Sequence, residues 1–281
     1  MATAADDALN PAYEPADIMR ALYGDGITAL KSAFPRDWAE RMREDIDALF
    51  AEAQAVPGGA LPRGPQRWYV EVHPERIRGF IDIATHPWFV AVCETVLGPD
   101  YRIVEVGFDI PFPGAADQPW HRDFFVPEAT TKGRRLNSLA FNLTAVDTVQ
   151  EMGPFEVAPG TQWDQFEGCP KGMFPPKHLW PRYIARAQQK MPQMGDMSVR
   201  SALTIHRGTA NRSDQPRPVL VVGVDAPDAT NAQHHDLQVT EGYLALLPPQ
   251  VRDHLTYRLA EELKPIIQHH TIDGLLEPAV Y

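Results

Sequence analysis

Apolar residues recur every three to four positions over the first third of the chain, a period typical of amphipathic helices. Residues 15–26 and 86–100 show this pattern and contain glycines near their ends, where helices commonly stop. We therefore predict a mainly helical N-terminal part over about 1–100, with one strand in residues 26–34. The clearest helix spans residues 35–56, in which charged side chains separate Trp38, Met42, Ile46, Leu49 and Phe50.

After residue 100 the pattern changes to short runs rich in β-branched and aromatic residues, bounded by Pro, Gly, Asn and Asp. No helix-length segment separates most of these runs, so a parallel α/β arrangement is not expected. The pattern predicts a mainly β fold with flanking helices, in which antiparallel sheets form a sandwich or a jelly-roll barrel over about 101–225. The predicted strands lie in residues 101–112, 136–146, 154–160, 201–208 and 217–227.

Two segments lie outside this predicted barrel. Residues 162–193 form a long insertion between two strands, and because long insertions often cover active sites we expect a mobile lid. Residues 226–281 form a C-terminal extension of mixed character, with a helical stretch expected in 240–263. We interpret the whole chain, residues 1–281, as a single domain.

Composition narrows the function classes. A net charge of −11 would repel nucleic-acid phosphates, so nucleic acid is not an expected partner, whereas homo-oligomers are left open. No run of about 18 apolar residues occurs, so no membrane span is predicted, and the N-terminus lacks the pattern of a secretory signal. Two cysteines, Cys93 and Cys169, do not make a disulfide framework, which favours a reduced, cytoplasmic setting.

The segment PWHRDFF carries the candidate chemistry. If it is extended, alternate side chains share a face, so His121 and Asp123 point the same way and Arg122 points the other way. An imidazole beside a carboxylate suits a borderline divalent metal, and His206, in a later β-like run, is the best candidate for a third ligand. Two histidines and one carboxylate leave positions open on a metal, as in non-haem Fe(II) oxygenases.

Alternatives remain open for these residues. An H-x-D pair also arises by chance on solvated surfaces, and a similar pair, His73 and Glu75, is expected in a turn because a proline separates them. Arg217 precedes a strand that we expect beside that of His206, where an arginine can clamp a carboxylate with two hydrogen bonds, although alone it also fits a surface turn. A non-catalytic metal- or ligand-binding β-barrel could also carry these histidines, and so could a zinc hydrolase, which would not need Arg217.

The motifs together resemble those of the phytanoyl-CoA dioxygenase family, over roughly residues 26–224. They are H-R-D at 121–123, GPFEVAPGT at 153–161, GD at 195–196 and H-x10-R from His206 to Arg217. The resemblance implies a double-stranded β-helix, a jelly-roll or cupin-like barrel, that uses Fe(II), 2-oxoglutarate and O2. It implies Fe(II) ligation by His121, Asp123 and His206, binding of the distal 2-oxoglutarate carboxylate by Arg217, and further co-substrate contacts from Gln118 and Thr161.

The resemblance also implies a reaction, in which 2-oxoglutarate becomes succinate and CO2 while an unactivated C–H bond of a small molecule is oxidised. Related halogenases have a small residue in place of Asp123, so the carboxylate favours hydroxylation, or desaturation or ring formation. The family often has histidine after P-G-[ST], where this chain has Gln162. That departure bears on the substrate pocket and not on the metal.

Substrate contacts are expected from two groups of residues. The aromatic side chains of Trp120, Phe124 and Phe125 are expected to wall the pocket, with a role in the core as the alternative. In the insertion, a helix would align Arg182, Arg186 and Lys190 on one face, because they are four residues apart. We expect this basic face to meet an anionic group of the substrate, with a solvated surface as the alternative.

Overall fold

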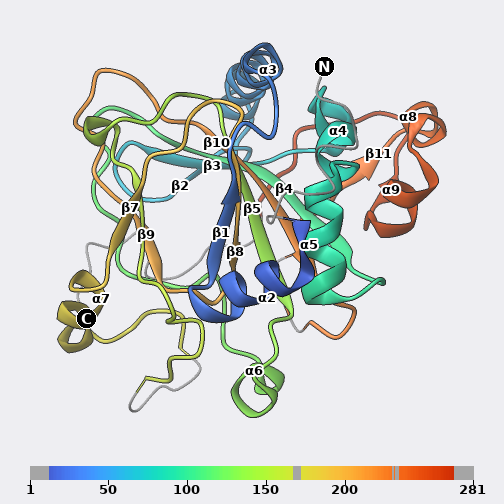
Figure 1. Cartoon of the computed structure of the whole chain (residues 1–281). Helices are drawn as coiled ribbons and strands as arrows, with labels where there is room; N and C mark the ends of the chain where they lie inside the picture. The colour runs from blue at the N-terminus through green and yellow to red at the C-terminus, as the bar shows by residue number, and fades with distance from the viewer. Residues whose placement is uncertain (1–12, 167–171, 230, 232–233, 269–281) are drawn as a thin grey trace.

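Two antiparallel sheets form the centre of the molecule in a computed structural model, which describes residues 13–166, 172–229, 231 and 234–268 (Figure 1). The larger sheet has the strand order β1-β8-β5-β10-β4-β3-β2, and the smaller has the order β7-β6-β9. The larger sheet contains β1 (Ile27–Leu30), β2 (Leu61–Pro62), β3 (Arg67–Glu71), β4 (Arg102–Pro111), β5 (Ser138–Thr144), β8 (Met197–Ser201) and β10 (Val219–Asp225). The smaller contains β6 (Phe155–Val157), β7 (Gln188–Lys190) and β9 (His206–Gly208).

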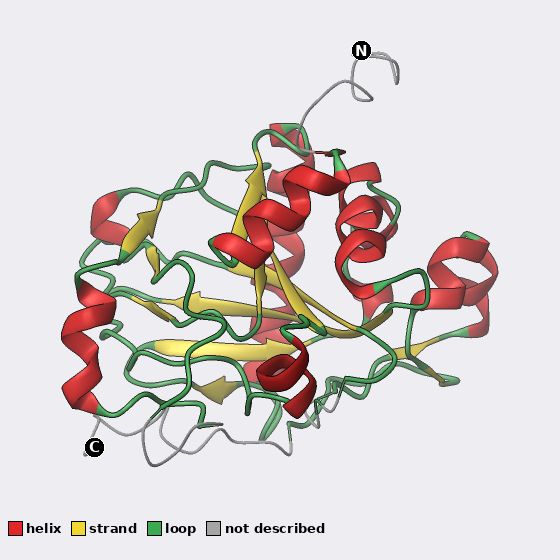
Figure 2. Ribbon diagram, turned by 60° about the horizontal axis from the view of Figure 1, so that its bottom comes forward, coloured by secondary structure: helices red, strands yellow, loops and turns green. Residues whose placement is uncertain are grey.

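Helices cover one face of the larger sheet, and Figure 2 shows strands in the middle of the molecule with helices around them. Strand β5 shows how the sequence makes the two faces, because successive side chains of a strand point to opposite sides. Phe141 packs on Phe89 of a helix, with ring centroids 4.3 Å apart, whereas Asn142 and Thr144 line a cavity on the other side. The helices are α2 (Pro15–Gly24), α3 (Arg36–Gln54), α4 (Phe80–Ala84), α5 (Pro87–Leu97), α6 (Glu128–Gly133), α7 (Trp180–Ile184), α8 (Glu241–Leu246) and α9 (Pro249–His254), with 3-10 turns at Pro74–Arg76, Gln150–Met152 and Lys177–Leu179.

The predicted fold class is confirmed, and several elements differ from the prediction. The first hundred residues supply β1 to β3 as well as helices, and these strands extend both edges of the larger sheet. The run 201–208 is not one strand: β8 ends at Ser201, and β9 begins at His206 in the other sheet. Strand β10 pairs with β4 and β5 and not with β9, because long-range pairing depends on the whole sheet and not on local pattern.

The C-terminal stretch predicted as helical is only partly so. Pro248 and Pro249 separate α8 from α9. A proline has no N–H to donate within a helix and disfavours the helical conformation of the residue before it, so α8 does not continue through them. The chain then forms β12 (Arg258–Leu259), which pairs in parallel with β11 (Gln238–Val239). Among the residues described above, no helix is both long enough and apolar enough to cross a membrane.

The insertion over 162–193 is joined to the fold at both ends, while its residues 167–171 lie outside the described residues. At one end the buried side-chain amide of Gln162 donates to the carbonyls of Leu22, Tyr23 and Gly24 at the end of α2, so this departure from the family motif has a structural role. At the other end β7 pairs with β6. The helix expected through Arg182, Arg186 and Lys190 is wrong, because α7 ends at Ile184 and Lys190 belongs to β7.

Candidate metal centre and co-substrate pocket

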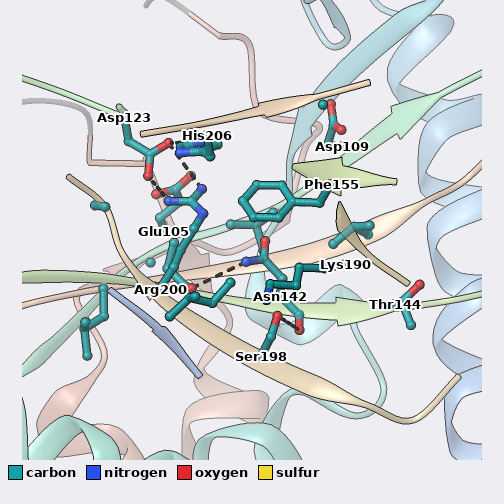
Figure 3. Close-up of a pocket in the computed structure, with 18 of the residues that line it drawn as sticks. Glu105, Asp109, Asp123, Asn142, Thr144, Phe155, Lys190, Ser198, Arg200 and His206 are labelled. Carbon is teal, nitrogen blue, oxygen red and sulfur yellow. Dashed lines mark hydrogen bonds and ion pairs between the residues drawn. The ribbon is translucent and has the colours of Figure 1, made fainter. Parts of the chain in front are cut away.

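The three predicted metal ligands lie together in the lining of one cavity, and Figure 3 shows two of them, Asp123 and His206. Ligand atoms of His121, Asp123 and His206 all lie within 4.8 Å of one another. The backbones of His121 and His206 exchange two hydrogen bonds, with N···O distances of 3.0 and 2.8 Å, and Asp123 N donates to Ala202 O at 2.9 Å. Arg122 points away as expected, with its guanidinium 4.3 Å from the ring centroid of Phe166.

Backbone carbonyls orient both imidazoles. Nδ1 of His121 lies 2.8 Å from the carbonyl oxygen of Pro119, and Nδ1 of His206 lies 2.8 Å from that of Thr204. A carbonyl only accepts, so each Nδ1 carries the proton and donates it. Each Nε2 is therefore left with a lone pair for a metal, an arrangement common among metal-binding histidines.

The protonation states also suit a divalent cation. Burial, with a contribution from His206, lowers the pKa of His121 to about 3, and burial with Arg200 lowers the pKa of His206. Burial alone would raise the pKa of Asp123, but Arg200 and His206 together hold it well below its usual range. At neutral pH the group offers two neutral imidazoles and one carboxylate, so no proton has to be displaced when a metal binds.

Arg200 of β8 contacts the metal ligand Asp123 and was not predicted from the sequence. Its guanidinium donates to both carboxylate oxygens of Asp123, through NH1 to Oδ2 and through NH2 to Oδ1 at 3.2 Å. A two-point contact of this kind fixes the plane of the carboxylate. Arg200 is therefore a positioning residue for the metal ligand.

We expect Arg200→Met to lower Fe(II) affinity by about 10- to 100-fold, the usual effect of losing a group that orients a ligand. Anaerobic titration of the metal-free protein with Fe(II) measures this. Arg41→Met, which removes an exposed ion pair on α3, is the matched control and should bind Fe(II) normally. Equal Fe(II) affinity in the two variants would show that Arg200 does not position Asp123.

A cavity of about 460 Å³ extends from the metal ligands between the sheets, and its other charged groups include two buried arginines. Arg67 of β3 is 2% exposed and donates to Asp109, to Gln118 Oε1 at 3.2 Å and to Thr209 O at 3.3 Å. Arg217 is 5% exposed, and its side chain makes one hydrogen bond within the described part of the chain, from Nε to Met152 O at 3.3 Å.

The two guanidinium groups leave a positive charge without a protein counter-ion. Burial, with repulsion from Arg67, lowers the pKa of Arg217 to about 10, so Arg217 still carries its charge at neutral pH. Arg67 forms an ion pair with Asp109, whereas no carboxylate among the described residues forms one with Arg217. Burying such a charge is costly unless an anion compensates it, so this end of the cavity fits a carboxylate ligand.

The two expected secondary co-substrate residues have different positions. Gln118 lines the cavity, where its amide oxygen accepts from Arg67 and from Gly208 N at 2.9 Å. Thr161 does not line it: its buried hydroxyl donates to Ala158 O at 2.6 Å and accepts from Ile205 N at 2.9 Å. This differs from the expected co-substrate contact, because Thr161 ties the loop after β6 to the backbone that leads into His206.

The expected substrate residues lie mostly outside the cavity. Trp120 is fully buried in a small apolar cluster, and Phe125 is 66% exposed, so of the three aromatic residues only Phe124 lines the cavity. Arg182 forms an ion pair with Asp164 at 2.6 Å, and neither it nor Arg186 lines the cavity, whereas Lys190, the third residue of the predicted basic face, does.

The comparisons with known proteins agree with this geometry. A profile of the family "Phytanoyl-CoA dioxygenase (PhyH)" matches residues 22–219. The structure is similar to that of EctD from S. alaskensis, solved with 2-oxoglutarate and 5-hydroxyectoine, with a TM-score of 0.62 and 16% identity over 77% of this chain and 78% of that one. It is also similar to the epimerase SnoN, solved with Fe3+, alpha ketoglutarate and nogalamycin RO, with a TM-score of 0.60 and 18% identity over 76% of this chain and 85% of that one. These likenesses show a shared fold, and the profile, which spans well over half of the sequence, shows that the chain belongs to the phytanoyl-CoA dioxygenase family.

Proposed function

We propose that this protein is a non-haem Fe(II)- and 2-oxoglutarate-dependent dioxygenase that oxidises an unactivated C–H bond of a small molecule. The observation that carries the proposal is the combination of the oriented donor set with a buried, uncompensated guanidinium in one cavity. A metal binder without turnover needs the donor set but not the guanidinium. The similar structures EctD and SnoN were solved with 2-oxoglutarate or alpha ketoglutarate, which supports the same assignment.

Each part of the site has a separate task. His121, Asp123 and His206 would hold Fe(II), which supplies, together with 2-oxoglutarate and O2, the oxidising power for the C–H bond. Arg217 would bind the distal carboxylate of 2-oxoglutarate by a charge-assisted pair of hydrogen bonds. Phe155, whose ring centroid lies 5.2 Å from that of His206, and Phe124 supply apolar cavity wall beside the metal ligands.

We propose hydroxylation as the reaction, because Asp123 provides a carboxylate at the position where a halogenase would leave room for chloride. Desaturation and ring formation would use the same site with a different substrate geometry. Phe174 of the insertion lies near the metal ligands, with its ring centroid 6.1 Å from that of His121. This contact supports the proposal that the insertion acts as a cover that limits the access of water.

Turnover without a known substrate tests this function. We expect slow conversion of 2-oxoglutarate to succinate in equal amounts, with a requirement for both Fe(II) and O2. Succinate and 2-oxoglutarate are measured by mass spectrometry, and Zn(II)-loaded protein is the control because it should be inactive. Absence of succinate in Fe(II)-loaded protein that binds 2-oxoglutarate would favour a non-catalytic binder, and O2-independent turnover would contradict the assignment.

A further inference from the structure

A second polar group lies in the cavity, on strands β4 and β3, and takes no part in the metal or co-substrate site. Glu105 lines the cavity (Figure 3), and its Oε1 accepts a hydrogen bond of 2.6 Å from the hydroxyl of Tyr69. Arg63 lies over the Tyr69 ring, 4.8 Å from its centroid. Among the described residues, however, no lysine or arginine forms an ion pair with Glu105.

Three other carboxylates that line the cavity each form an ion pair with an arginine or a lysine. Asp123 has Arg200 as its partner, Asp109 has Arg67, and Asp196 has Lys31. Each of these carboxylates is therefore already compensated by a fixed cation of the protein. Glu105 differs from them because its neighbours are a phenol and an imidazole.

The sheet is shaped to hold this carboxylate. Gly223 of β10 lies opposite Glu105, and a Cβ added there would meet Glu105 Oε2 at 2.5 Å. A Cβ added at Gly107 would meet the Tyr69 hydroxyl at 2.8 Å. Glycine inside a strand weakens the strand and often marks a close approach of another group. At these two positions the missing side chains leave the space that Tyr69 and Glu105 occupy.

A buried histidine side chain also faces this place. The side chain of His235 is 6% exposed, and its Nδ1 lies 3.0 Å from the backbone oxygen and 3.2 Å from the backbone nitrogen of Val106. Its Nε2 lies 3.6 Å from Glu105 Oε1 and 3.8 Å from Glu71 Oε1, which is too long for a hydrogen bond to either. Polar atoms held apart at such distances leave a place for a bridging polar group of a ligand or for a water molecule.

The path from this group to the metal ligands carries small side chains. Across the sheet, Glu105 is followed by Gly223, then by Ala140 and then by Arg200, the partner of Asp123. Three strand spacings separate the two ends of this row, roughly 14 Å between the backbones. Because the middle of the row has no long side chain, a small molecule can contact Glu105 at one end and approach the metal ligands with the other.

We propose that Glu105, supported by Tyr69 and His235, binds a cationic nitrogen of the substrate, an amine or an amidine-type group. The substrate class is then a small organic cation, oxidised at a C–H bond remote from its charged nitrogen. This inference rests on the proposed oxygenase function. It differs from the anionic substrate expected from Arg182, Arg186 and Lys190, of which only Lys190 lines the cavity.

Two probes of nearly equal shape test the proposal: cyclohexylammonium, which is charged, and cyclohexanol, which is not. Binding of each to the anaerobic Fe(II)- and 2-oxoglutarate-loaded protein is measured by calorimetry. We expect the ammonium probe to bind about tenfold or more tightly, as a hydrogen bond to a charged group provides. Glu105→Gln should remove that preference, and Glu44→Gln, which changes an exposed carboxylate on α3, should retain it.

A wild-type protein without a preference for the ammonium probe, or a Glu105→Gln variant that keeps it, would overturn the proposal. If Glu105→Gln does not fold, Tyr69→Phe decides, because it removes only the hydroxyl that orients the carboxylate. We expect it to reduce the preference several-fold, and an unchanged preference would count against the proposal. The visible absorption band of the Fe(II)–2-oxoglutarate complex distinguishes a failure of the oxygenase function from a failure of the substrate class. Absence of the band refutes the oxygenase function. Its presence without a preference for the ammonium probe refutes only the substrate class.

Discussion

His206→Ala is expected to abolish 2-oxoglutarate turnover and to lower Fe(II) affinity by more than about 100-fold. The loss of a group that merely orients a ligand costs about 10- to 100-fold, so the loss of a ligand itself should exceed that range. The variant removes one of the three donor atoms that lie within 4.8 Å of one another. His121→Ala is expected to behave in the same way.

Fe(II) affinity is measured by anaerobic titration and turnover by succinate release. His178→Ala, at an exposed histidine in the insertion, controls for the loss of an imidazole in general and should match the wild type. Because His206 also pairs with His121 through the backbone, which alanine retains, the variant should keep its fold and its circular dichroism spectrum. Near-normal turnover in either active-site variant would contradict the proposed metal centre.

Arg217→Ala is expected to raise the KM for 2-oxoglutarate by roughly 30-fold to several thousand-fold. Loss of one partner of a buried charge-assisted pair costs about 2–5 kcal/mol, which corresponds to that range. Without co-substrate the same change should not lower the melting temperature, because the buried guanidinium has one protein hydrogen bond and is repelled by Arg67. Stability and co-substrate binding should thus respond differently to one substitution.

Arg212→Ala is the matched control, because Arg212 lies exposed in the same loop. Arg217→Lys should restore only part of the affinity, since an ammonium group cannot form the two parallel hydrogen bonds of a guanidinium. If the KM for 2-oxoglutarate is unchanged in Arg217→Ala, the co-substrate carboxylate is bound elsewhere, and Arg67 is then the residue to change next.

The metal ligands could be predicted because their signal is local or lies in a motif. His121 and Asp123 are two positions apart, so an extended backbone suffices to place both on one side, and His206 follows from the order of motifs. Arg217 was found for the same reason. The pairing of their strands was predicted incorrectly, but the site did not depend on it.

Arg67, Arg200 and Glu105 could not be found in this way. They lie on β3, β8 and β4, far apart in the sequence, and only the register across the larger sheet brings them to one cavity. Their single signal was a polar residue at alternate positions of an apolar strand, as at Asn142 and Thr144, which shows a polar face but not its neighbours. The prediction of a common basic face for Arg182, Arg186 and Lys190 was wrong for the opposite reason, because it relied on local spacing alone. Spacing by four predicts a common face only where the helix continues.

The most direct test of the central claim is anaerobic titration of Fe(II)-loaded protein with 2-oxoglutarate, followed by visible absorption. A weak charge-transfer band should appear and saturate at one 2-oxoglutarate per protein, and it should be absent with Zn(II) and in His206→Ala. Arg217→Ala should shift the titration to higher 2-oxoglutarate concentrations without removing the band. A folded protein that binds Fe(II) but develops no band at saturating 2-oxoglutarate would contradict the account.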